Sequence, residues 1–308
     1  FMQINSQDEQ FHEFKYLLEL ILKNKKIKNC NFFFNTKDFP IMTKKGFEPY
    51  HHIYGENVPL TSHRFESYSP IISYGNRLNI FQDIQVPTPD CIDIITQKIF
   101  PTLYINNYID DELKNIFNKK YNSSDIIRGC VWKKKKDICI WRGKSTGCAT
   151  DFNNPRLLIT KINQEWKNDK LLKDYLDAGI SSTSFKPSKY IDDTTLSAID
   201  LNKLKISTLS KVSMKEQMKY KYILDIQGNA SAYRLGYLLS FKSVLLKVES
   251  EYSIWIDEFL EPYKHFIPIK KDFSNLAIVI KWCKEHDKTC EKIANNAFEL
   301  FRKCYSCN

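Results

Sequence analysis

Two short apolar runs in the second half of the chain constrain its fold most. Residues 220–226 and 243–248 are rich in Ile, Leu, Val and Tyr and are too short for buried helices, which is typical of buried strands. Between them, residues 228–231 form a glycine-led turn and residues 232–240 carry a helical pattern. A strand, a helix and a second strand in this order predict parallel pairing, so this half is expected to be an α/β unit.

The neighbouring segments continue this alternation. Residues 137–141 are predicted to form a strand, and Asn154 before Pro155 is typical of a helix N-cap followed by proline at the first helical position. Residues 265–269 are a further candidate strand. The last two expected helices span residues 272–286, with Asp272 in the cap, and residues 288–303.

The first half predicts a second α/β unit. Apolar residues between 11 and 21 recur at helical spacing, and the runs at 30–34 and 70–73 are typical of strands. A polar segment at 106–124 is also expected to be helical. The chain therefore divides into two predicted α/β domains and a last helix, at residues 1–131, 132–286 and 287–308.

Composition excludes several classes of protein. The 308 residues are 43% hydrophobic, which suits a packed core, and no run of about 18 apolar residues predicts a membrane span. The net charge is +10, but only seven of the 46 basic residues are arginine, and a Lys-, Asn- and Ile-rich chain is also what an AT-rich genome encodes. The one dense basic run, residues 133–136, is expected to be a solvated connection, so no nucleic-acid partner is predicted.

Cysteine usage favours a reducing compartment. Nine cysteines spread along a chain of this size do not suggest a disulfide framework, and Cys304 and Cys307 form the one C-x-x-C, too little for a zinc site. No secretory leader is recognised at the start of the sequence. The cytoplasm is the expected location, and the lumen of the secretory pathway is the alternative if a leader has been removed.

Polar residues follow several predicted strands, where open α/β sheets bind their ligands. Asp38 follows an apolar run and either acts as a general base or only closes the turn before Pro40. Residues 142–147 form a glycine-flanked loop with donors for an anion, or a plain surface loop. Arg234 stands at a predicted helix start, where it either binds a diphosphate or is solvated or ion-paired. Arg156 is a similar candidate that can equally be structural.

Missing motifs narrow the chemistry further. The chain contains neither G-x-x-x-x-G-K-[ST] nor G-x-G-x-x-G, so two common nucleotide-binding loops are absent. It also lacks Asp-x-Asp and H-E-x-x-H, which argues against a metal-dependent single-domain sugar transferase and a zincin.

Several motifs together resemble glycosyltransferase family 90, the family of the Rumi-type protein O-glucosyltransferases and the fungal capsule xylosyltransferases. The longest match is Tyr-Lys-Tyr-Ile-Leu-Asp-Ile-Gln-Gly-Asn-Ala-Ser-Ala-Tyr-Arg-Leu-Gly-Tyr-Leu-Leu at 220–239. Trp-Arg-Gly-Lys-Ser-Thr-Gly at 141–147 resembles the family's Arg-Gly loop, and Asn-Thr-Lys-Asp-Phe-Pro at 35–40 resembles its Asp-(Tyr/Phe)-Pro motif. Further matching blocks lie at 243–247, 262–268, 272–276 and 282–287.

The resemblance implies a fold and a reaction. The fold is GT-B-type, with two Rossmann-like domains facing across a cleft and the C-terminal helix returning to the first domain. The reaction is an inverting transfer of glucose or xylose from a UDP-sugar to a hydroxyl of a glycan or protein, with no obligatory metal and no expected need for manganese. Asp38 would be the base, and Arg234 with a helix N-terminus would stabilise UDP. The implied nucleotide-binding residues are Arg142, Gly143, Lys144, Ser145, Thr146, Ala230, Ser231, Ala232, Tyr233 and Arg234.

One alternative stays open at this point. A GT-B-shaped protein that binds a sugar or nucleotide without turnover would have a similar sequence, although the presence of Asp38, Arg142 and Arg234 favours the enzyme. The composition suggests a large DNA virus or a protist as the source.

Overall fold

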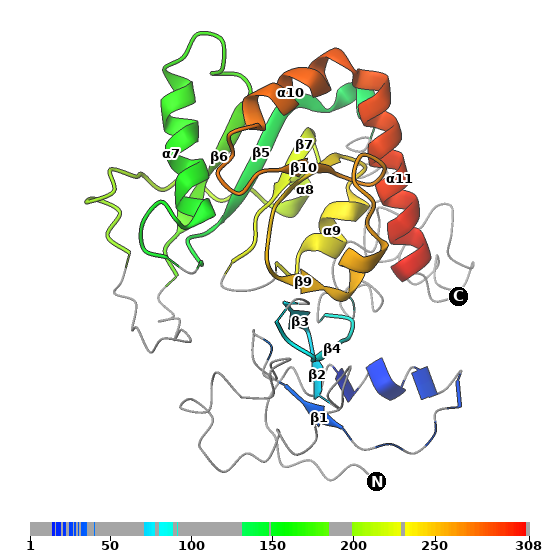
Figure 1. Ribbon diagram of the computed structural model, residues 1–308. Coiled ribbons are helices and arrows are strands. Elements are labelled where there is room, and N and C mark those ends of the chain that lie inside the picture. Colours follow the sequence, from blue (N-terminus) through cyan, green and yellow to red (C-terminus); the bar gives the residue numbers. More distant parts are fainter. Residues whose placement is uncertain are drawn as a thin grey trace, which may run out of the picture.

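The computed structural model describes residues 131–184 except 148, residues 199–228, residues 232–305 and, before them, parts of 14–40 and 71–91. Figure 1 shows a larger sheet flanked by helices, with the N-terminal strands below it. The strands are β1 (Phe33–Phe34), β2 (Ile71–Ser73), β3 (Gly75–Asn76), β4 (Ile84–Gln85), β5 (Lys136–Lys144), β6 (Leu176–Ser182), β7 (Tyr220–Asp225), β8 (Val244–Val248), β9 (Ser253–Ile254) and β10 (Ile267–Ile269). The helices are η3 (Trp132–Lys134), α7 (Pro155–Lys167), α8 (Met214–Gln217), α9 (Leu235–Ser240), η4 (Trp255–Phe259), α10 (Leu276–Glu285) and α11 (Asp287–Tyr305).

The C-terminal sheet has five strands in the order β10-β8-β7-β5-β6, and every pair in it is parallel. The chain leaves β5 through α7 to reach β6 at one edge, then returns to β7 on the other side of β5. The order of the strands therefore reverses between β5 and β7. This arrangement confirms the predicted parallel α/β class.

Helices cover both faces of the C-terminal sheet (Figure 1). The buried side chains of α7 and α10 join one apolar cluster, around Trp141 and Tyr222. Those of α9 join a second cluster, around Ile223 and Leu245. Because α7 and α9 leave the sheet on opposite faces, the strand order reverses at the place where open α/β sheets form their binding crevice.

Local sequence explains most element boundaries. The Asn154 side chain accepts a hydrogen bond from the Arg156 N–H and Pro155 begins α7, as predicted. Two boundaries were predicted wrongly: β5 continues through Lys144 into the expected loop, and α9 begins at Leu235 instead of 232. Asp272 does not cap α10; its carboxylate accepts a hydrogen bond from the Ser274 N–H in the preceding turn.

The N-terminal sheet consists of three parallel strands in the order β1-β2-β4. Phe14 from the preceding helical segment stacks on Phe34, with ring centroids 4.3 Å apart. A buried chain of hydrogen bonds runs from the Asn35 amide to the Ser73 hydroxyl and on to the Asp83 carboxylate. The described residues thus bear out a second, smaller parallel α/β unit, in agreement with the expected GT-B-type arrangement.

The C-terminal helix α11 packs against α9, α10 and β8 of the C-terminal sheet. Its last turn also approaches the first half of the chain, because Tyr305 lies 5.5 Å from the Trp255 ring and the Trp255 indole N–H donates to Cys91 Sγ. The predicted domain boundaries stay predictions, and the expected helix at 106–124 lies outside the described residues. In the described part of the chain, no helix has the length and apolarity needed to cross a membrane.

Candidate active site

The carboxyl ends of β5, β7 and β8 form the edge of the C-terminal sheet that faces the crevice; we call it the carboxyl edge. Trp141 in β5 is fully buried beneath this edge. Two guanidinium groups lie over its ring, those of Arg156 and Arg234, each 5.7 Å from the ring centroid. Both cations therefore gain attraction to the indole face where the strand order reverses.

Arg156 is a structural connector. Its Nε donates to the Gln227 carbonyl and its Nη2 to the Ile226 carbonyl, at 2.8 and 2.9 Å. Its Nη1 donates to the Lys144 carbonyl and to the Thr146 hydroxyl. Burial, helped by the nearby charge of Arg234, lowers the pKa of Arg156 to about 9, so the group stays charged at neutral pH. Nearly all of its donors are used to hold the loops after β5 and β7 together.

Arg234 is held more loosely. Its Nη1 donates to the Arg142 carbonyl at 2.9 Å, and its Nη2 makes a long contact of 3.5 Å with the Leu224 carbonyl. Its Nε is buried and has no hydrogen-bond partner among the described residues. Burial lowers the pKa of Arg234, while the charge of Asp225 opposes that shift. A half-buried cation with unused donors is well suited to bind an anion.

Arg142 does not join this pair. Its Nη2 lies 2.6 Å from Asp177 Oδ1 in β6, and its other bonds go to the carbonyls of Trp141, Asp177 and Ser210. Its side chain leaves the strand on the side opposite that of Trp141, as alternation along β5 requires. The described geometry therefore gives no support to the nucleotide-binding role expected for its guanidinium, whereas its carbonyl positions Arg234.

The other residues expected in the loop after β5 shape its path. A Cβ atom on Gly143 would stand 2.8 Å from the Trp141 ring. The buried Ser145 hydroxyl accepts a hydrogen bond from the Ser184 N–H, while the Lys144 side chain is exposed. A Cβ atom on Gly228 would meet the Thr146 hydroxyl oxygen at 2.9 Å, so the loops after β5 and β7 approach this closely because residue 228 is glycine.

Three of the expected site residues, Asp38, Ala230 and Ser231, lie outside the described residues. Tyr233 precedes α9, and its ring centroid lies 6.1 Å from that of Tyr74 in the N-terminal half. The expected contribution of a helix N-terminus at 230–233 is reduced, because α9 has only six residues and begins after this segment.

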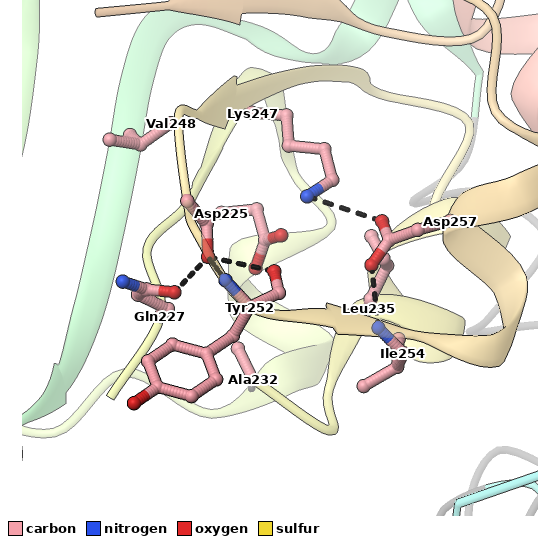
Figure 2. A pocket seen from close by; sticks show the side chains of 10 residues that line it. Asp225, Gln227, Ala232, Leu235, Lys247, Val248, Tyr252, Ile254 and Asp257 are labelled. Carbon is pink, nitrogen blue, oxygen red and sulfur yellow. Dashed lines mark hydrogen bonds and ion pairs between the residues drawn. The ribbon is translucent and has the colours of Figure 1, made fainter. Parts of the chain in front are cut away.

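Sequence reasoning missed a small hollow near Arg234, lined by Leu235 next to it in the chain. Figure 2 shows it between the ends of β7 and β8 and the segment that leads into η4. Ala232 is one of its lining residues. Its polar lining comes from Asp225, Gln227, Lys247, Ser250, Tyr252 and Asp257. Asp225 lies inside the predicted strand as the last residue of β7, and a carboxylate that interrupts an apolar run is the signal that could have found it.

Charges in the hollow are partly paired. Lys247 Nζ lies 3.2 Å from Asp257 Oδ1, and Asp257 Oδ2 accepts a hydrogen bond from the Ile254 N–H. Burial lowers the pKa of Lys247, but Asp257 and Asp225 outweigh it and the net direction is upward. Burial raises the pKa of Asp225, against the opposing charges of Lys247 and Arg234. Asp225 is thus the residue of the hollow whose charged form is disfavoured by burial.

The hollow touches the junction of the two sheets. β3 pairs with β9 in antiparallel fashion, and Gln85 donates to the Ser253 carbonyl at 2.7 Å. Arg77 lies 2.5 Å from Glu251 Oε2 and over the Tyr252 ring. The segment 250–254 therefore joins the N-terminal half to the wall of the hollow.

A parallel sheet with cationic side chains at the switch point of its carboxyl edge is typical of α/β proteins that bind phosphorylated ligands. This chain belongs to glycosyl transferase family 90, whose sequence pattern matches residues 7–306. The resemblance seen in the motifs is confirmed. In the described part of the chain, no group of three or more His, Cys, Asp or Glu side chains could hold a metal ion.

Individual relatives include viral and vertebrate proteins. Uncharacterized protein 179R of Invertebrate iridescent virus 6 is 28% identical over 316 residues, covering 94% of this chain and 26% of that protein. Protein O-glucosyltransferase 3 of Mus musculus is 32% identical over 225 residues, covering 73% of this chain and 37% of that protein. The chain thus spans well under half the length of these relatives. Viral relatives agree with the suggested source.

Solved structures resemble the chain more weakly. The Anabaena protein Alr3699/HepE, crystallised with UDP and glucose, has 11% identity and a TM-score of 0.44 over 96% of this chain and 71% of that one. Likeness at this level defines neither a fold nor a ligand.

Proposed function

We propose that this chain transfers a sugar from a UDP-sugar to a hydroxyl group of a glycan or a protein. The observation that carries the proposal is the state of Arg234, half-buried against Trp141 at the switch point with unused donors. A diphosphate offers the paired oxygens that a guanidinium binds side by side, and it would supply further opposite charge. Membership of family 90 supports the same reaction.

Arg234 would act on the leaving group. As the bond between the anomeric carbon and the diphosphate oxygen breaks, the electron pair stays on UDP and its negative charge grows. A preorganised cation at that place stabilises the transition state by about 3–4 kcal/mol. The Arg142 carbonyl would hold Arg234 in position, and Arg156 would hold the loops after β5 and β7 together; neither needs to touch the ligand.

Asp38 is the proposed general base, on the strength of the Asp-Phe-Pro motif. It would take the proton from the acceptor hydroxyl as that oxygen attacks the anomeric carbon from the face opposite UDP. The new glycosidic bond then has inverted configuration, and UDP departs. Positioning and charge stabilisation suffice in this scheme, so no metal is included.

Glucose is the proposed sugar because relatives of 27–32% identity are named protein O-glucosyltransferases. Xylose, which lacks one hydroxymethyl group, is the second choice. The acceptor is a glycan or protein hydroxyl, and the cytoplasmic location stays a prediction.

Binding and turnover test the proposal together. UDP at a hundredfold its Kd should stabilise the protein by about 2.7 kcal/mol, with no comparable effect of ADP or GDP. UDP-glucose with an acceptor should then release UDP. Binding of UDP without release from any UDP-sugar would favour the non-catalytic alternative.

Replacing the base gives the sharper result. Asp38→Asn should keep the parent's affinity for UDP and lose transfer, since only proton removal depends on the carboxylate. Asp169→Asn, an exposed aspartate in the turn after α7, is the matched control and should keep both properties. Equal transfer by Asp38→Asn and the parent would remove Asp38 from the mechanism.

A further inference from the structure

The hollow beside Arg234 contains a polar pair that the proposed reaction leaves unused. We infer that Asp225 and Lys247 together bind one ring hydroxyl of the nucleotide sugar, which makes Asp225 a specificity-determining residue. The inference rests on the proposed use of a nucleotide sugar. The hydroxyl belongs either to the ribose or to the transferred sugar, since both rings are attached to the diphosphate.

Sheet register brings the two side chains together. Asp225 and Lys247 are direct partners in the parallel ladder of β7 and β8, so their side chains stand on the same face. Both line the hollow, and Figure 2 shows both side chains reaching into it. They come from the carboxyl ends of two neighbouring strands, where the ligand is expected.

Asp225 offers a free acceptor. The residue is only 5% exposed, yet its Oδ1 has no hydrogen-bond partner among the described residues. A buried polar atom left in this state costs free energy that a ligand can recover. Burial raises the pKa of Asp225, and an O–H group donated to the carboxylate would favour its charged form.

Lys247 offers a positioned donor. Its Nζ lies 3.2 Å from Asp257 Oδ1, and Asp257 is itself fixed by the Ile254 N–H. An ammonium group has three N–H donors, and this ion pair occupies one of them. Asp257 therefore acts as a positioning residue for Lys247, and donors remain for a ligand in the hollow.

The pair selects the chemical class of its ligand. A hydroxyl donates one hydrogen bond and accepts others at the same oxygen, which matches an acceptor beside a donor. A phosphate would be repelled by Asp225, and an ammonium by Lys247. The hollow has room for about one water molecule, about 20 Å³. The hollow therefore takes part of a nucleotide sugar, next to the diphosphate at Arg234.

Titration calorimetry tests the inference without need of an acceptor. The variants are Asp225→Leu, which removes the acceptor, and Asp225→Asn, which keeps a neutral one and protects the test if the first fails to fold. Asp169→Asn is the matched control. The ligands are UDP, its 2′-deoxy and 3′-deoxy forms, and UDP-glucose.

The expected loss for Asp225→Leu is roughly 10- to 100-fold in affinity, with a smaller loss for Asp225→Asn. If the ribose hydroxyl is bound, UDP shows the loss, and one deoxy form binds parent and variant equally. If the transferred sugar is bound, UDP is unaffected and UDP-glucose shows the loss. Removing a negative charge near a diphosphate would by itself strengthen binding, so a loss reports the hydroxyl.

Two results would overturn the inference while the proposed function stands. One is unchanged affinity of both Asp225 variants for UDP and for UDP-glucose. The other is an equal loss for UDP and for both deoxy forms, which would show an indirect effect. Failure of the unmodified chain to bind UDP would instead overturn the proposed function, and the inference with it.

Discussion

The carboxyl edge has one group of charged side chains at the end of β5 and another at the ends of β7 and β8. The two groups differ in how many of their donors and acceptors are already bonded within the protein. At the end of β5, Arg142 and Arg156 spend almost all their donors on backbone carbonyls and on Asp177. At the ends of β7 and β8, Arg234 and Asp225 each keep a buried atom without a partner in the described part of the chain. We interpret the group at β5 as structural and the group at β7 and β8 as available to a ligand.

The difference teaches that residue type alone does not mark a binding residue. What separates Arg156 from Arg234 is the number of donors already used by the protein. Buried polar groups are normally satisfied, and the unsatisfied atoms of Arg234 and Asp225 at the switch point are what the proposed ligand would complete.

The largest expected effect comes from Arg234→Ala. Transfer should fall roughly 100- to 1,000-fold in kcat/KM, or about 3–4 kcal/mol, because the leaving group loses its cation. UDP affinity measured by calorimetry should fall as well. Arg142→Ala is the comparison, and a folded sample of it should bind UDP within a few fold of the parent. Equal losses of UDP affinity in Arg234→Ala and Arg142→Ala would mean that the two arginines do not differ in their roles.

A second effect should appear in stability. Arg156→Met leaves the carbonyls of Gln227, Ile226 and Lys144 without their donor, which we expect to lower the free energy of unfolding by about 2–3 kcal/mol. Urea denaturation measures it. Arg302→Met, in an exposed pair with Glu299 on α11, is the matched control and should cost under about 1 kcal/mol. An Arg156→Met protein as stable as the control would show that the group at β5 is not structural.

The smallest expected effect is a gain in the free energy of unfolding, whereas Arg156→Met is expected to lower it. Because burial raises the pKa of Asp225, the folded chain holds this proton to higher pH than the unfolded chain does. Stability is therefore lost as pH rises from about 4, the ordinary pKa of aspartate, through the raised pKa. Asp225→Asn should remove this loss and raise the free energy of unfolding at neutral pH by on the order of 1 kcal/mol.

Denaturation of the parent and of Asp225→Asn across pH 3 to 8 measures that gain. The two proteins should converge at the acid end and separate as the pH rises. A constant difference in the free energy of unfolding across this pH range would mean that burial does not raise the pKa of Asp225 in the unliganded chain.

Much of the C-terminal sheet could be predicted because its signals are local. The apolar runs of β7 and β8 and the Asn154 cap need no distant partner to be recognised. β6 was missed because Leu176–Ser182 contains Asp, Gly and Ser, and it becomes a strand by pairing with β5. The late start of α9 was equally hidden, since Arg234 itself occupies the N-cap position in helical backbone geometry.

The candidate site was predicted less well for a physical reason. No local signal in the sequence separates the role of Arg142 from that of Arg234. Asp177, which pairs with Arg142, lies 35 residues away on a strand that was not expected. Lys247 interrupts an apolar strand, a signal that has meaning only once Asp225 is known to stand beside it in register. Asp38 and the segment 229–231 lie outside the described residues, so their roles remain proposals.

The segment 250–254 contacts both the hollow and the N-terminal half. Ser250, Tyr252 and Ile254 line the hollow. Glu251 and Ser253 bond to Arg77 and Gln85, and Arg77 also lies over the Tyr252 ring. Under the proposed function, a donor in the hollow would touch the same short segment that contacts the N-terminal half. Filling the hollow and placing the N-terminal half would then be linked equilibria, each favouring the other by the same factor. Donor binding would thus prepare the N-terminal half before an acceptor arrives.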